Sequence, residues 1–219
     1  MRHTNAGVLA AALLLAATGV HAQDVPRRAV RVLLTHSMTS GTSAHGAACS
    51  CPESGDVLAP VSLSSLEFEV AWTLWRGGGW GVEYPIRAVP LALVRNNPTA
   101  AARLDPDGPG WVLSSRTPRD STVGLGIKPL GIRGWAGSDR VGLEGEVSSG
   151  FVHFGSPLFA ANGTQFNFVI EVGIGLRVDL PGRGATVIGY KWHHLSNAGL
   201  GEVNPGLNSG VLYVAFRFD

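Results

Sequence analysis

Residues 165–180 read QFNFVIEVGIGLRVDL, and the pattern in this segment sets the architecture expected for the whole chain. Every even-numbered position is apolar, whereas Gln165, Glu171 and Arg177 stand at odd positions. Successive side chains of a β-strand point to opposite faces, so the pattern predicts a strand with one apolar and one polar face. The segment exceeds the roughly ten residues that a transmembrane β-strand needs. It therefore predicts a strand between lipid and the lumen of a barrel.

The same alternation recurs in seven further segments. They are 29–36, which is the weakest, 65–74, 80–87, 123–128, 141–151, 188–193 and 212–218. Short glycine-rich connections alternate with the long connections 37–62, 95–121, 155–164 and 197–207. Outer-membrane barrels have an even number of strands, short periplasmic turns and long outer loops. The sequence therefore predicts an all-β, eight-stranded antiparallel transmembrane β-barrel.

The beginning of the chain predicts export. The apolar run 8–17 is too short to span a bilayer, and Val20-His21-Ala22 has the small-x-small form of a cleavage site. We therefore expect a signal peptide over residues 1–22 and a single domain over 23–219, located in the outer membrane. The net charge is +1 and only 15% of residues are charged, so nothing favours a nucleic-acid partner.

Three polar features of the sequence are interpreted as structural. Cys49 and Cys51 are expected to be an exposed loop pair without catalytic or metal-binding duty, because a bridge across one residue is strained. Glu144 and Glu146 resemble a paired-carboxylate site, but opposite charges in a packed lumen are the preferred interpretation. The lumen would hold these further charged residues: Glu67, Glu69, Glu83, Arg87, Lys128, Glu171, Arg177 and Lys191.

The segment 189–209, GYKWHHLSNAGLGEVNPGLNS, holds the candidate chemistry. His194 and Ser196 are two residues apart on one predicted strand, so they share a face, and parity with Trp192 makes it the lipid-facing one. His193 would then point into the lumen. A serine is a poor nucleophile without a base, and a histidine can supply one. The pair predicts a site that a lipid within the leaflet can reach.

A third residue completes this hypothesis. If the turn centres near Gly201, Asn208 lies opposite His194 and also points outward, where its oxygen could orient the imidazole. The backbone from Asn197 to Gly199 is the natural source of oxyanion donors. Glu202 is the nearest carboxylate, but it stands in the loop and ranks below Asn208. Three aromatic residues, Tyr84, Trp135 and Trp192, are expected to anchor the barrel at the membrane interfaces.

The motif HLSNAG at 194–199, followed by NPG at 204–206 and an aromatic last strand, resembles the outer-membrane lipid A 3-O-deacylase family, also called PagL-like or acyloxyacyl hydrolase-like. The resemblance is strongest over 189–218. It implies Ser196 as nucleophile, His194 as base and oxyanion donors from Asn197 and Gly199. It also implies hydrolysis of the ester-linked 3-O acyl chain of lipid A in the outer leaflet, with no cofactor. The family carries a glutamate where this chain has Asn208, and a neutral partner stabilises the imidazolium less.

Two other readings of the sequence stay open at this point. A non-catalytic small barrel, serving as an adhesin, a receptor or a structural anchor, would share the fold. A soluble lipocalin-like carrier in the periplasm would have its faces reversed, apolar inside and polar outside. Lipopolysaccharide and outer-membrane lipids are the partners expected for the enzyme. The sequence does not fix the oligomeric state, for which a homodimer is one alternative.

Overall fold

The structure is a computed structural model that describes most of the chain. The described residues are 28–37, 45–46, 49–50, 61–99, 103–104, 111–112, 119–138, 140–180, 184–202, 204 and 206–218. The expected signal peptide, residues 1–22, lies outside them, and so do Cys51 and the side chain of Cys49. Within these ranges no helix is long and apolar enough to span a membrane.

Eight long strands build the main sheet, and all eight predicted strands are among them. They are β1 (Arg28–Ser37), β4 (Ser62–Gly77), β5 (Trp80–Pro98), β8 (Arg119–Gly137), β9 (Val141–Phe154), β10 (Phe166–Leu180), β11 (Gly184–Ser196) and β12 (Leu207–Phe218). Four short strands form two hairpins in the long connections. They are β2 (His45–Gly46) with β3 (Cys49–Ser50), and β6 (Arg103–Leu104) with β7 (Trp111–Val112).

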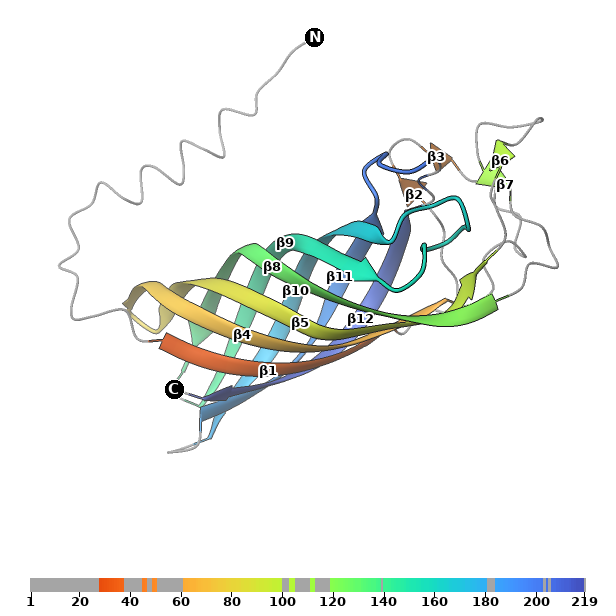
Figure 1. The fold of residues 1–219 in the computed structure, drawn as a ribbon. Coiled ribbons are helices and arrows are strands. Elements are labelled where there is room, and N and C mark those ends of the chain that lie inside the picture. The colour runs from red at the N-terminus through yellow and green to blue at the C-terminus, as the bar shows by residue number, and fades with distance from the viewer. Residues whose placement is uncertain are drawn as a thin grey trace, which may run out of the picture.

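The sheet closes because β1 pairs with both β4 and the last strand, β12. Neighbouring strands are antiparallel throughout the order β1-β12-β11-β10-β9-β8-β5-β4. Figure 1 shows the strands running obliquely around one barrel, with the two short hairpins at one end, here called the long-loop end. The predicted eight-stranded antiparallel barrel is thereby confirmed.

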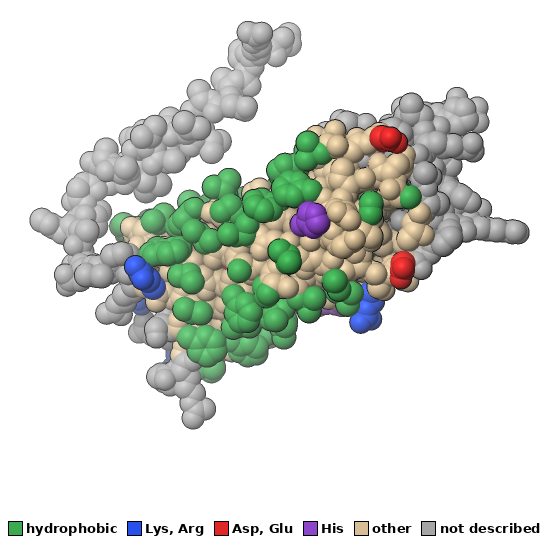
Figure 2. All heavy atoms as spheres, in the orientation of Figure 1, with side chains coloured by type: hydrophobic (Ala, Val, Ile, Leu, Met, Phe, Trp, Pro, Cys, Tyr) green, Lys and Arg blue, Asp and Glu red, His purple; other side chains and the backbone are tan. Residues whose placement is uncertain are grey.

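The outer wall of the barrel is apolar. On β10, the outward side chains Phe168, Ile170 and Val172 are between 38% and 47% exposed. Figure 2 shows hydrophobic side chains along the wall and the visible charged side chains near the two ends. An apolar wall around a polar lumen is typical of a transmembrane barrel. The described residues show the opposite of the arrangement that a soluble lipocalin-like carrier requires.

The middle of the lumen is filled by paired charges. Among the described residues, six arginines and lysines and six glutamates are buried, so their formal charges balance. They are Arg31, Arg87, Lys128, Arg133, Lys191, Arg217, Glu67, Glu69, Glu83, Glu144, Glu146 and Glu171. Glu144 accepts two hydrogen bonds from Arg31, at 2.8 and 2.7 Å. Glu146 is paired with Arg87 and Lys191. The structural interpretation of Glu144 and Glu146 is therefore confirmed.

A bulge in β8 explains two residues that the sequence pattern misplaced. The register with β9 shifts between Ile127 and Leu130, so outward positions change from odd to even numbers. Arg133, which the pattern missed, consequently lies in the lumen and bonds Glu83 at 3.0 Å. Trp135 also turns inward: it pairs with Glu144 across the strands, and the Arg177 guanidinium lies 4.8 Å from its ring centroid. The expectation that Trp135 anchors the barrel at a membrane interface was wrong.

The connection between β9 and β10 folds back as a plug at the long-loop end. Its residues Leu158, Phe159 and Ala160 are buried, and the first two pack with apolar side chains of the barrel, including Leu195 and Leu207. Asn97 of β5 holds this plug, since it donates to the carbonyl of Pro157 at 2.8 Å and accepts from the Phe159 N–H at 2.7 Å. The plug therefore gives the end of the β11–β12 hairpin a packed support.

Candidate active site on the outer wall

The β11–β12 hairpin sets the candidate residues on one face. Its register runs without a shift from Ala185 with Arg217 to Leu195 with Leu207. His194 lies opposite Asn208, as the parity of the two strands predicted. On the other side, His194 pairs with Ile170 and Ser196 with Phe168, both of which face outward. His194 and Ser196 therefore lie half-buried on the lipid-facing wall, where β11 meets its loop.

Asn208 holds the imidazole of His194. The Nδ1 of His194 lies 2.8 Å from the Oδ1 of Asn208. An amide oxygen only accepts hydrogen bonds, so Nδ1 carries the proton and Nε2 keeps its lone pair. That tautomer can accept a proton from a serine hydroxyl. No hydrogen bond joins Ser196 to His194 among the described residues, and in unliganded enzymes such a contact often forms only with substrate.

The two N–H groups expected as oxyanion donors are occupied within the loop. The N–H of Asn197 donates to Oδ1 of Asn204 at 3.0 Å. The N–H of Gly199 donates to Oδ1 of Asn197 at 2.9 Å. Ala198 and Gly199 have φ angles of 51° and 81°, which is the left-handed conformation of a tight turn. As oxyanion donors, these groups would have to exchange a loop side chain for the substrate.

Asn204 and Gly206 have roles that the sequence pattern did not reveal. The φ of Gly206 is not positive, so the backbone does not require glycine there. A Cβ on Gly206 would lie 3.3 Å from Cε1 of His194 and 3.7 Å from Cβ of Ser196. Gly206 therefore allows the backbone to pack more closely against His194 and Ser196 than a residue with a side chain would. The signal available in the sequence was the position of Gly206, two residues before Asn208.

Glu202 does not approach the imidazole. Its carboxylate is exposed and accepts a hydrogen bond from Nδ2 of Asn162 at 3.4 Å. The preference for Asn208 over Glu202 as the partner of His194 therefore agrees with the geometry.

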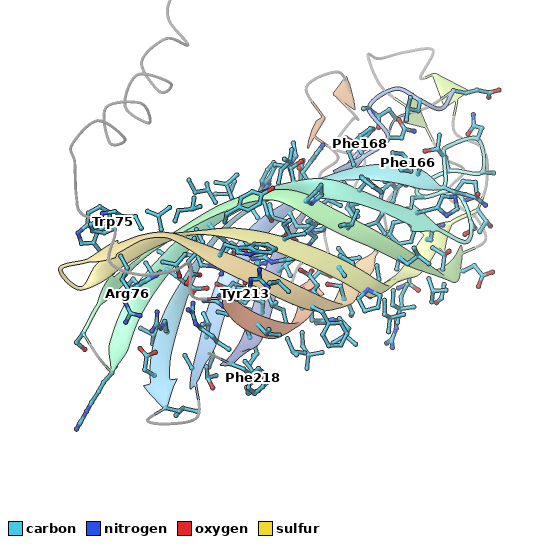
Figure 3. All side chains as sticks on the ribbon, turned by 60° about the vertical axis from the view of Figure 1, so that its left-hand side comes forward. Trp75, Arg76, Phe166, Phe168, Tyr213 and Phe218 are labelled. Atoms are coloured by element: carbon cyan, nitrogen blue, oxygen red, sulfur yellow. The ribbon has the colours of Figure 1, made fainter. Side chains whose placement is uncertain are left out.

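An aromatic surface adjoins Ser196. Phe166 and Phe168 meet edge to face with ring centroids 5.3 Å apart, and Phe151 stacks on Phe166 at the same distance. Phe168 is the cross-strand neighbour of Ser196. Figure 3 shows Phe166 and Phe168 near the long-loop end, with Trp75 and Arg76 at the opposite end. The candidate nucleophile thus borders an apolar surface that suits a hydrocarbon chain.

A second serine–histidine pair lies on the outer wall. The Nδ1 of His36 on β1 is 2.8 Å from the Oγ of Ser64 on β4. Within the described ranges no side chain holds the other nitrogen of the His36 ring. A ring without an orienting partner is a poorer general base, so this pair ranks below His194 and Ser196.

A third arrangement lies inside the barrel and is sealed from substrate. His193 bonds Glu171 through Nδ1 at 2.8 Å, and Ser209 stands opposite His193 in the register. The order of residue types is that of a Ser–His–acid triad. All three side chains are buried by the packed lumen, however, so no ester could reach Ser209. The expectation that His193 is a lumen residue is confirmed.

Within the described ranges, no cluster of three or more histidine, cysteine, aspartate or glutamate side chains is arranged to hold a metal ion.

Comparisons with known proteins agree with this geometry. Residues 131–217 match the family model described as lipid A 3-O-deacylase (PagL). The solved structure "Crystal structure of the outer membrane enzyme PagL" superposes with a TM-score of 0.53 at 16% identity, covering 86% of this chain and 98% of that one. No curated protein matches the chain. The matched segment contains β11 and all of β12 except its last residue, Phe218. The chain therefore has the same barrel fold as the outer membrane enzyme PagL, and its C-terminal residues 131–217 carry a likeness to the lipid A 3-O-deacylase family.

Proposed function

We propose that this protein is a serine esterase that hydrolyses the ester-linked 3-O acyl chain of lipid A in the outer leaflet of the outer membrane. The observation that carries the proposal is the 2.8 Å contact between His194 Nδ1 and Asn208 Oδ1, on the lipid-facing wall beside Ser196. A lipid lying in the leaflet can reach this wall. The family match over residues 131–217 supports lipid A as the substrate.

In the first half of the reaction, Ser196 becomes acylated. Its Oγ attacks the ester carbonyl carbon, and its proton passes to Nε2 of His194. Asn208 keeps Nδ1 protonated, so that Nε2 is the nitrogen that receives the proton. The tetrahedral intermediate collapses, the C–O bond to the sugar breaks, and the sugar oxygen takes the proton from His194. The acyl chain stays on Ser196.

In the second half, water releases the acyl chain. His194 takes a proton from a water molecule, whose oxygen attacks the acyl carbon. The bond to Ser196 Oγ breaks, and Oγ recovers the proton from His194. The products are a free fatty acid and lipid A with one hydroxyl in place of an ester. These steps need no group beyond those of the chain and water.

The surroundings suit such a substrate. The aromatic surface of Phe151, Phe166 and Phe168 offers a hydrocarbon chain a contact beside Ser196. Oxyanion donors are proposed from the N–H groups of Asn197 and Gly199, once the substrate oxygen displaces the loop side chains that accept from them.

The test is mass spectrometry of lipid A from cells that express the wild type or single variants. We expect loss of one hydroxyacyl chain with the wild type, and unchanged lipid A with Ser196→Ala and with His194→Ala. The matched controls are Ser64→Ala and His36→Ala, which remove the second pair on the outer wall. Both controls are expected to behave as the wild type.

Two outcomes would contradict the proposal. Lipid A that is unchanged by the wild-type protein, when that protein is folded and inserted, would argue for a non-catalytic barrel. Deacylation that survives Ser196→Ala but is lost in Ser64→Ala would move the chemistry to β1 and β4.

A further inference from the structure

The indole of Trp192 lies against the ring of His194. Their ring centroids are 5.7 Å apart and the two planes differ by 14°, so the rings are stacked. Trp192 precedes His194 by two residues on β11 and is 42% exposed on the outer wall. One face of the imidazole is therefore covered by an aromatic π-system, while its Nδ1 edge is held by Asn208.

The proton transfer of the proposed reaction creates a cation at this place. Asn208 is neutral, so it can hold the ring but offers no compensating charge. Glu171, the nearest carboxylate on the neighbouring strand β10, points to the lumen and is already paired with Lys128 and His193. The face of a tryptophan ring attracts a cation whose position is within about 6 Å of its centroid. The attraction strengthens where water is excluded, as it is on a wall that faces lipid.

Stacking also fixes the orientation of the imidazole. A hydrogen bond to Asn208 leaves the ring free to tilt about the axis through Nδ1. The indole restricts that tilt, because a tilted ring would lose its contact. The two contacts together define the plane in which Nε2 must lie to receive the proton of Ser196.

We propose that Trp192 is a positioning residue of this site, which stabilises the imidazolium form of His194 through its π-face and fixes the plane of the ring. The inference rests on the proposed function. It adds a fourth member to Ser196, His194 and Asn208. The aromatic ring of Trp192 stabilises the imidazolium cation, because the other three residues carry no negative charge that could do so.

The test compares Trp192→Leu and Trp192→Phe in the purified, folded full-length protein, with lipid A in detergent micelles as substrate. Trp192→Leu keeps the wall apolar but removes the π-face, and Trp192→Met is a second aliphatic variant. Trp80→Leu is the matched control. Trp80 is 41% exposed on the same outer wall, but it is the first residue of β5 and lies at the end of the barrel opposite the long-loop end. We expect kcat to fall about tenfold in Trp192→Leu and Trp192→Met, with KM changed less than about twofold.

Recovery by the conservative variant completes the test. Trp192→Phe should retain a kcat within about threefold of the wild type, because a phenyl face also attracts a cation. Trp80→Leu should leave both constants unchanged. An increase in KM at constant kcat would overturn the inference, since Trp192 would then contact the lipid. A Trp192→Phe variant as slow as Trp192→Leu would overturn it as well.

The same assay separates this inference from the function on which it rests. If the wild type and Ser196→Ala are equally inactive, the esterase and the role of Trp192 fall together. If the wild type is active, Ser196→Ala is inactive and Trp192→Leu matches the wild type, only the role of Trp192 fails.

Discussion

Gly206 shows how a single missing side chain can shape a site. A Cβ at this position would lie 3.3 Å from Cε1 of His194, which is closer than most such contacts in proteins. Gly206→Ala should therefore displace the imidazole by a few tenths of an ångström and lower kcat roughly tenfold. The measurement is the rate of deacylation in detergent micelles. Gly134→Ala is the control, because a Cβ there meets nothing within 4 Å, and equal rates in the two variants would contradict the prediction.

Asn208 determines how the imidazole is held. Asn208→Ala removes the acceptor for Nδ1, so the correct tautomer is no longer selected, and kcat should fall about 100-fold. Asn208→Asp keeps the shape and adds a negative charge, which strengthens the hydrogen bond and stabilises the imidazolium. We expect a kcat several-fold above the wild type for Asn208→Asp, measured under the same conditions. An aspartate variant slower than the wild type would show that the neutral amide is the better partner.

At the scale of the strands, uninterrupted alternation decided what could be predicted. On β11 and β12 the register has no shift, so parity placed His194, Ser196 and Asn208 on the outer wall and His193 in the lumen. On β8 the predicted strand stopped at residue 128, and because the bulge reverses the parity, extending its pattern would have placed Arg133 on the outer wall. A bulge depends on pairing with a neighbouring strand, which a count along one strand does not contain.

The loops were less predictable than the strands, because loop geometry depends on contacts that do not recur at a regular spacing along the sequence. The bond from the Asn197 N–H to Asn204 depends on how the chain returns from β11 to β12. The alternation of side chains predicts that Trp192 and His194 lie on the same face of β11. It does not predict the angle between their rings, on which the stacking depends. The residue types of the candidate site could therefore be predicted from the sequence, whereas the hydrogen bonds of the Asn197 and Gly199 N–H groups could not.

The plug between β9 and β10 depends on one side chain of β5. Asn97 makes two hydrogen bonds to the plug backbone, at 2.8 Å to Pro157 and 2.7 Å from Phe159. Asn97→Leu would leave these backbone groups without a partner and should lower the free energy of unfolding by about 2–4 kcal/mol. Urea unfolding in detergent micelles measures the change. Ala161→Ser, at an exposed position on the same connection, should change it by less than about 0.5 kcal/mol. Similar values for both would mean that Asn97 does not hold the plug.

At the scale of the whole molecule, the buried charges must be matched for the barrel to close. The single side chain of Arg133 contacts three glutamates, which are Glu69 at 2.5 Å, Glu83 at 3.0 Å and Glu146 at 3.0 Å. Arg133→Met would leave these carboxylates short of one cation in the lumen, and we expect a loss of about 3–5 kcal/mol of stability. The measurement is the temperature at which the folded band is lost in heat-modifiable gel electrophoresis. Arg140→Met, at an exposed turn, should keep the wild-type temperature, and a normal temperature for Arg133→Met would show that the remaining cations suffice.

The position of Ser196 on the outer wall has a kinetic consequence. An enzyme whose pocket opens to water meets substrate in proportion to its bulk concentration. In the proposed function, Ser196 attacks a lipid that already lies in the hydrocarbon layer, so encounters would occur by lateral diffusion in two dimensions. The rate should then follow the mole fraction of substrate in the surrounding amphiphile, and adding inert detergent at constant total substrate should slow the reaction. The membrane would thereby act as the reservoir that supplies the proposed substrate to Ser196.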